Sequence, residues 1–236
     1  MSQKYDLTDI GNALSEAMDN PVVETIRSGA VGVLGLADPV LGIAAGIGND
    51  LLSKYNDFKL SYLLNGLASG CNLEKRLNQL YTYVTSSSEK AIKVANLFKQ
   101  TVNAECPKAC IIYGLIMASH LESGTKFTYD ELIVCKAIES ATDYDLQNFK
   151  IIMENYLKST SNGRRVVFPE NFSEISTFTT TCNWCVYNRL FVSRTAEWEE
   201  MGGGTLDIST YYYEANPASV LLHYINDASQ TWYYCY

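Results

Sequence analysis

The stretch from Ser28 to Asn49, SGAVGVLGLADPVLGIAAGIGN, constrains the fold of this chain more than any other feature. It carries one charge, Asp38, and consists mainly of Gly, Ala, Val, Leu and Ile. Because apolar surface is driven out of water, this stretch must lie in a protein core, in a subunit interface or in a bilayer.

Asp38-Pro39 divides the apolar stretch near its middle. Proline removes a helix donor and pushes the preceding residue out of the helical region. We therefore expect a helix to begin at Pro39 and to run through Leu52 toward Leu64. Each apolar arm is then about ten residues long, whereas a helix that spans a bilayer needs about 20.

Gly42 and Gly46 form a G-x-x-x-G pattern with Ala45 between them. Small residues at this spacing let two helix backbones approach closely. The segment 28–52 is then a buried part of the chain's own core, a self-association surface, or a re-entrant membrane hairpin. The membrane alternative is the least favoured because flanking positive charge is absent. We take Gly42, Ala45 and Gly46 as interface candidates and expect a homo-oligomer.

The charge balance disfavours polyanionic partners. The chain has a formal net charge of −8, with 47% apolar and 19% charged residues. Nucleic acids and anionic lipids attract basic patches, and the linear sequence shows no cluster of Lys and Arg. Arg164-Arg165 is an isolated pair beside a turn. Nucleic acid is therefore not an expected partner, and an unidentified protein is.

The cysteine pattern indicates reduced thiols. Seven cysteines are present, which is an odd number, and no secretory signal precedes them. We expect a cytoplasmic protein, with membrane association through the segment 28–52 as the alternative.

Residues 1–124 are predicted to form a helical domain. Asn72 is a suitable N-cap for LEKRLNQLYTYV, and Pro107 opens KACIIYGLIMASHL, which is apolar nearly all round and therefore central. GLASG, from Gly66 to Gly70, is predicted to break the preceding helix. Short loops between amphipathic helices are typical of a bundle.

Residues 125–236 are predicted to form an α+β domain. Three helical segments precede two strands, FVSRTAEWE and LDISTYYYE, with EMGGGT as the hairpin tip, and a helix opens at Asn216-Pro217. This order resembles a winged helix-turn-helix domain. The predicted fold class is mainly α: a helical bundle followed by a winged-helix-like α+β region with a small antiparallel hairpin. Its third helix offers one cation, Arg189, and the tip carries Glu197, Glu199 and Glu200, which disfavours DNA.

Two cysteine pairs are the weak metal candidates. Cys182 and Cys185 have the C-x-x-C spacing, and Cys106 and Cys110 lie four residues apart on a predicted helix. The four thiols would make a zinc site if the fold joined them. The favoured alternative is that they are small buried side chains. His120 and His223 are interpreted as structural, so we expect no catalytic residue, no cofactor and no enzymatic activity.

The aromatic end, TWYYCY, is a candidate docking surface. Aromatic residues with a polar group are favoured at interfaces, so Trp232, Tyr233 and Tyr234 are further interface candidates.

The run from Ala30 to Ile47 and the tail YYYEANPASVLLHYI are similar in layout to bacterial abortive-infection proteins of the alpha type, a phage-defence class. The resemblance implies a non-enzymatic interaction or effector protein and transfers no active-site residue. We expect it to self-assemble through the apolar segment. A winged-helix transcriptional or nucleic-acid-binding regulator is the alternative. A metalloprotein or enzyme that uses Cys182, Cys185 and a histidine is the third.

Overall fold

The computed structural model describes residues 5–17, 51–169, 173–199 and 206–232. The chain forms two compact units: Met1–Thr128 together with Asn226–Tyr236, and Tyr129–Ile225. The sequence predicted a boundary between residues 124 and 125. The candidates Gly42, Ala45 and Gly46 lie outside the described residues, so their role stays a prediction.

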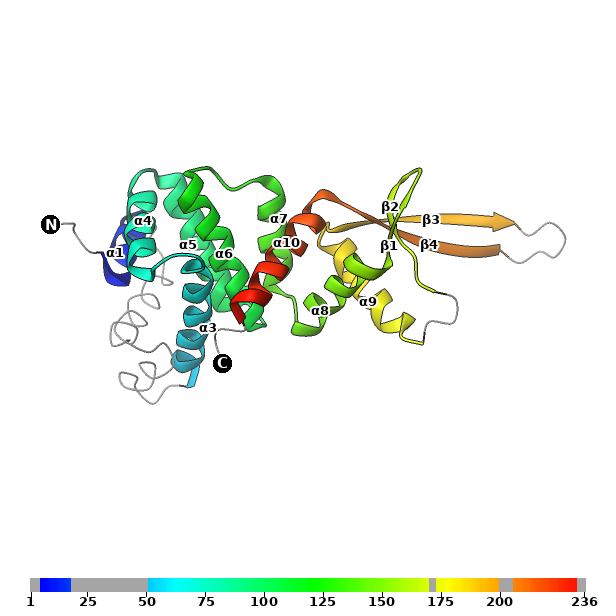
Figure 1. Ribbon diagram of the computed structural model, residues 1–236, viewed down its shortest axis with the longest axis horizontal. Helices are drawn as coiled ribbons and strands as arrows, with labels where there is room; N and C mark the ends of the chain where they lie inside the picture. Colours follow the sequence, from blue (N-terminus) through cyan, green and yellow to red (C-terminus); the bar gives the residue numbers. More distant parts are fainter. Residues whose placement is uncertain (1–4, 18–50, 170–172, 200–205, 233–236) are drawn as a thin grey trace. The chain divides into compact units, whose positions relative to one another are not determined.

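The first unit is built from helices (Figure 1). In chain order they are α1 (Leu7–Ala17), α3 (Leu51–Leu67), α4 (Leu73–Thr85), α5 (Ser88–Asn103) and α6 (Pro107–Ser123). Asn72 caps α4, because its side-chain Oδ1 accepts from the Glu74 backbone N–H at 2.8 Å. Pro107 occupies the first turn of α6, where its missing N–H costs nothing. Both helix starts confirm the sequence prediction.

Helix α6 is the centre of the first unit. Every residue from Ala109 to Ala118 is buried, and α6 contacts α3, α4 and α5. Gly114 on α6 faces Gly66 on α3. A Cβ built on Gly114 would lie 2.1 Å from the Leu63 carbonyl oxygen, and one built on Gly66 would lie 2.1 Å from the Ile111 carbonyl oxygen. The two backbones are therefore in direct contact.

The break predicted at GLASG is confirmed and falls in its last three residues, from Ala68 to Gly70. Helix α3 continues through Gly66 to Leu67, and the chain turns only afterwards, where Gly70 has a φ of +68°. Gly66 stays helical because the contact with α6 requires a residue without a side chain. Gly70 provides the left-handed conformation that the turn needs.

The second unit combines helices with a sheet. Its elements are α7 (Tyr129–Glu139), α8 (Asp143–Ile151), the π-helix η2 (Ile152–Tyr156), β1 (Leu157–Thr160), β2 (Gly163–Val166), α9 (Ile175–Tyr187), β3 (Phe191–Glu199), β4 (Leu206–Glu214) and α10 (Asn216–Trp232), of which the part after Ile225 belongs to the first unit. Helix α8 begins with a capping box, in which Thr142 accepts from the Asp145 N–H and Asp145 accepts from the Thr142 N–H.

The sheet has the strand order β1-β2-β4-β3, and every neighbouring pair is antiparallel. The predicted pair, β3 and β4, is confirmed, and the hairpin β1–β2 extends it through the pairing of Arg165 with Tyr213. The described part of the chain is thus mainly helical with an α+β region after the helical region, as predicted. Among the described residues, no helix is long and apolar enough to cross a membrane.

Candidate binding surface

The four cysteines proposed for a metal site fall in two separate units. Cys106 and Cys110 belong to the first unit, and Cys182 and Cys185 belong to the second. Within the described ranges, no group of three or more His, Cys, Asp or Glu side chains is placed to hold a metal ion.

The thiols are buried and held protonated. Burial raises the pKa of Cys110 to about 12 and that of Cys182 to about 12, and it raises the pKa of Cys185 well above its usual value. The Cys110 thiol donates to the Cys106 carbonyl oxygen at 3.6 Å. Since the thiolate is the reactive and metal-binding form, these side chains fit the interpretation as small buried groups.

The two histidines take part in packing. His120 is buried on α6, its Nδ1 lies 3.1 Å from Thr125 Oγ1, and its ring lies 4.2 Å from the Phe127 ring. His223 is exposed on α10, and its ring lies 5.3 Å from that of Tyr224. The contacts of His120 with Thr125 and Phe127 fit its interpretation as a structural residue.

The aromatic interface candidates lie at the limit of the described residues. Trp232 is the last residue of α10, and the structure does not describe its side chain. Tyr233 and Tyr234 lie outside the described residues. Their docking role stays a prediction.

A shallow groove of about 560 Å³ lies on the first unit, between residues of α4, α5 and the end of α6. Several of its polar groups already have partners within the chain. The Lys90 ammonium lies over the Tyr83 ring at 4.4 Å, Asn78 accepts from the Tyr5 N–H, and Gln79 accepts from Arg76. The groove therefore presents few groups that a ligand could satisfy.

The two faces of the sheet differ in what covers them. In an antiparallel pair, directly opposite residues share a face and successive residues alternate. Phe191 and Tyr212 are buried on one face, where the Tyr212 hydroxyl donates to Asn183 Oδ1 of α9 at 2.9 Å. Phe149 of α8 also packs against Phe191, with ring centroids 6.0 Å apart. This inner face is covered by α8 and α9.

The register assigns the alternate residues to the other face. Lys158 pairs with Arg165, Arg165 with Tyr213, Tyr213 with Val192, and Arg194 with Tyr211. Lys158 and Arg194 are exposed, and Val192 is 49% exposed, so this face is open to solvent. We call it the outer face and define it by six residues: Lys158, Arg165, Val192, Arg194, Tyr211 and Tyr213.

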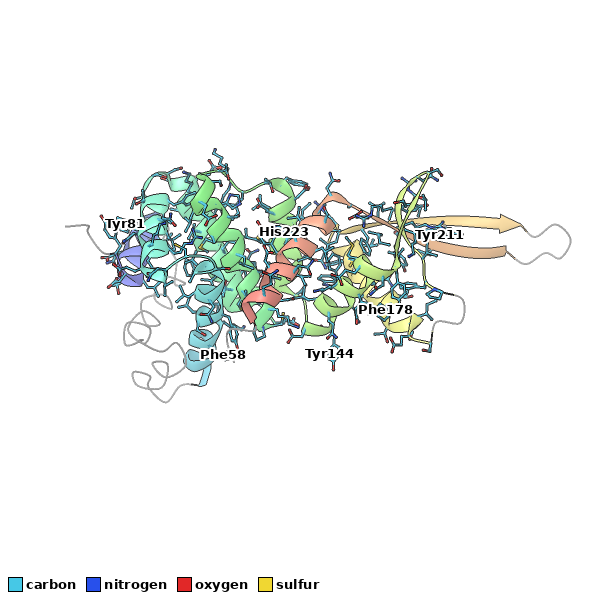
Figure 2. All side chains as sticks on the ribbon, in the orientation of Figure 1. Phe58, Tyr81, Tyr144, Phe178, Tyr211 and His223 are labelled. Carbon is cyan, nitrogen blue, oxygen red and sulfur yellow. The ribbon has the colours of Figure 1, made fainter. Side chains whose placement is uncertain are left out.

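Arginines and tyrosines interdigitate on the outer face. The Arg165 guanidinium lies over the Tyr211 ring at 4.7 Å, and the Arg194 guanidinium lies over the Tyr213 ring at 4.9 Å. Both contacts are diagonal across the strand pairs, which is within reach of long side chains. Figure 2 labels Tyr211 on the sheet and Phe178 on α9. The result is two cation–π contacts, each of one ring and one guanidinium.

Among the side chains that the structure describes, the cations of the outer face have no carboxylate partner; Asp207 shares this face by register, but its side chain is not among them. Arg164, one residue before Arg165, lies on the inner face and forms an ion pair with Glu214 at 3.0 Å. By contrast, the described part of the chain gives Lys158, Arg165 and Arg194 no ion pair, and Arg165 Nε is buried without a hydrogen-bond partner. Arg76 Nε and Trp184 Nε1 share this state, so the feature that distinguishes the outer face is its exposed cations, Lys158 and Arg194, which remain available to an anionic ligand.

Comparison of the chain with protein-family models, with curated proteins and with solved structures found no match. The abortive-infection resemblance therefore stays a prediction, and the outer face must be interpreted from its own chemistry.

Sequence reasoning missed this surface. The sequence presents Arg164-Arg165 as an isolated pair, because the residues that join Arg165 lie at least 27 positions further along in β3 and β4 or precede it in β1. One signal was present: Val192 and Arg194 alternate in β3, and Tyr211 and Tyr213 alternate in β4. The outer face forms because β2 pairs with β4, and no local sequence pattern predicts that pairing.

Proposed function

We propose that this chain is a non-enzymatic nucleic-acid-binding protein and that the outer face is its contact surface. The observation that carries the proposal is the set of three cations, Lys158, Arg165 and Arg194, which three strands bring to one face without an acidic partner among the described side chains. This is the alternative that the sequence left open.

The acidic net charge of the chain does not oppose such a local surface. Exposed charges that lie more than about 10 Å apart are largely screened at physiological salt, so a ligand responds mainly to the charges near it. The tip residues Glu197, Glu199 and Glu200 were the sequence argument against DNA. The structure does not describe the side chains of these three residues. The proposal of nucleic-acid binding is therefore based on the outer face alone.

The other expectations remain proposals with a separate basis. Self-assembly through Gly42, Ala45 and Gly46, an effector role in phage defence, and a protein partner all depend on the segment 28–52 or the chain end. None of them conflicts with a nucleic-acid contact in the second unit. Oligomers would place several outer faces on one strand and increase avidity.

The test is fluorescence anisotropy with labelled oligonucleotides of about 12 nucleotides, a length within the range of known single-strand sites. If three phosphate contacts form, the logarithm of the affinity should fall against the logarithm of the salt concentration with a slope of about −2. Arg165→Gln with Arg194→Gln should weaken binding about tenfold or more at about 50 mM salt.

The matched control is Arg164→Gln, which removes a neighbouring arginine from the inner face. It should leave the affinity within about twofold, because Arg164 is already paired with Glu214. Binding that is equal in all three proteins, or no binding to any oligonucleotide at low salt, would rule out the outer face as a nucleic-acid contact.

A further inference from the structure

We infer that the ligand of the outer face is single-stranded nucleic acid and that Tyr211 and Tyr213 stack on its bases. This inference rests on the proposed function and narrows it. It assigns the tyrosines a role in binding that the cations alone do not require.

The tyrosine positions suit successive bases of an extended strand. Tyr211 and Tyr213 lie two positions apart on β4, which corresponds to about 7 Å along a strand. Both side chains are half-buried, so their rings are already ordered, and little conformational entropy is lost on binding. Each ring contacts a guanidinium, and bases stack on both kinds of plane.

The charges match a strand whose backbone runs beside its stacked bases. Arg165 Nε is buried and lacks a partner, and Lys158 and Arg194 are exposed at the two sides of the rings. Stacking platforms lined by cations are the general design of surfaces that bind single strands. Phosphate oxygens would bond to the exposed Lys158 ammonium and Arg194 guanidinium while the bases stack on the rings.

A duplex fits this unit less well. Reading a duplex usually requires an element that enters a groove and cations that hold the phosphates on both sides. Helix α9, the third helix of the winged-helix order, contains no Lys or Arg between Ile175 and Tyr187. In a duplex the base planes are also stacked on each other and unavailable to Tyr211 and Tyr213.

The experiment compares four probes of equal length on the full chain: a mixed-sequence single strand, an abasic strand with the same phosphates, the duplex, and poly-glutamate. DNA and RNA single strands are both used, and either counts as the ligand. Replacement of one stacking aromatic ring should weaken binding of the single strand about tenfold. We therefore expect Tyr211→Leu with Tyr213→Leu to bring the affinity for the single strand down to that for the abasic strand.

The control variant is Tyr144→Leu, which removes a tyrosine that is 77% exposed on α8. It should leave the affinity for every probe unchanged. Circular dichroism and the melting temperature of each variant verify that the fold is intact. If Tyr211→Leu fails to fold, quenching of tyrosine fluorescence by the single strand and not by the abasic strand provides the same comparison in the unmodified protein.

The outcomes separate the two claims. Equal affinity for the single and abasic strands overturns base stacking but leaves the proposed function in place. Tighter binding of the duplex or of poly-glutamate also overturns the inference, in favour of a groove or a protein partner. Absence of binding to every nucleic acid at low salt overturns the proposed function itself.

Discussion

The crossing of α3 and α6 in the first unit is a contact between two backbones, whereas the outer face in the second unit presents side chains. At the crossing, Gly66 and Gly114 bring two helix backbones into direct contact, and no room remains for a side chain. On the outer face, the strands hold cations and rings toward solvent, and Arg165 keeps an unsatisfied donor. The first region therefore contributes to stability, and the second is the surface at which we propose that a ligand binds. Substitutions should therefore unfold the protein in one region and spare its fold in the other.

Gly114→Ala should have the largest effect on stability. Its Cβ would lie 2.1 Å from the Leu63 carbonyl oxygen, and backbone on both sides leaves little scope for relaxation. We expect a loss of about 3 kcal/mol or more in the free energy of unfolding, measured by denaturant titration. Gly124→Ala is the control, because Gly124 has a φ of +66° in open space. It should cost only about 1 kcal/mol. Equal losses would show that the crossing is looser than described.

Tyr212→Ala compared with Tyr213→Ala tests the two faces of the sheet. Tyr212 is buried on the inner face and donates to Asn183, so its truncation should cost about 3 kcal/mol. Tyr213 is half-buried under Arg194, and its truncation should cost about 1 kcal/mol or less. Thermal melts of both variants give the difference. A larger loss at Tyr213 would mean that the outer face is part of a core.

Thr142→Ala tests whether stability and ligand binding are separate properties, because Thr142 is not part of the outer face. It removes the capping box of α8, in which Thr142 and Asp145 satisfy each other's backbone donors. The expected cost is about 1 kcal/mol, measured as a shift in the unfolding midpoint. Its affinity for the single strand should be unchanged. Weaker binding would indicate that stability and ligand contact are not separate properties in the second unit.

Glu89→Gln should have the smallest effect, because it removes only solvent-exposed ion pairs of the first unit, those of Glu89 with Lys93 and Lys126. Hydrogen bonds from Lys126 and Lys93 lower the pKa of Glu89 to about 2. A lowered folded-state pKa contributes stability above the ordinary value near 4.5, and this contribution is lost as the pH falls toward 2. The melting temperatures of the variant and the unmodified protein should differ slightly at pH 7 and converge near pH 2, with salt reducing the difference. A difference that persists at pH 2 would have another origin.

Local patterns were sufficient for most of the fold. Asn72 and Pro107 predicted two helix starts because capping chemistry depends on neighbours in sequence. The strands around EMGGGT and the mainly helical first region were predicted for the same reason. The sequence predicts a close approach of two helix backbones at Gly42 and Gly46, which lie outside the described residues, whereas the described residues show one at Gly66 and Gly114. Gly66 and Gly114 are 48 positions apart, and a spacing rule that applies within one helix cannot identify such a pair.

The candidate surface could not be predicted, because it depends on pairing between strands that are distant in sequence. Arg165 meets Tyr213 only through the register of β2 with β4. The cysteines show the reverse case: Cys182 and Cys185 have a spacing used for metals, but burial keeps their thiols protonated. Spacing alone indicates neither burial nor which residues meet across a sheet.

Photo-crosslinking of a single-stranded oligonucleotide to the full chain, followed by mass spectrometry of the attached peptides, tests the central claim most directly. The account predicts crosslinks at Tyr211 and Tyr213, and their loss in the Arg165→Gln, Arg194→Gln protein. Crosslinks confined to the groove beside Lys75 and Lys90, or to any surface other than the outer face, would contradict it.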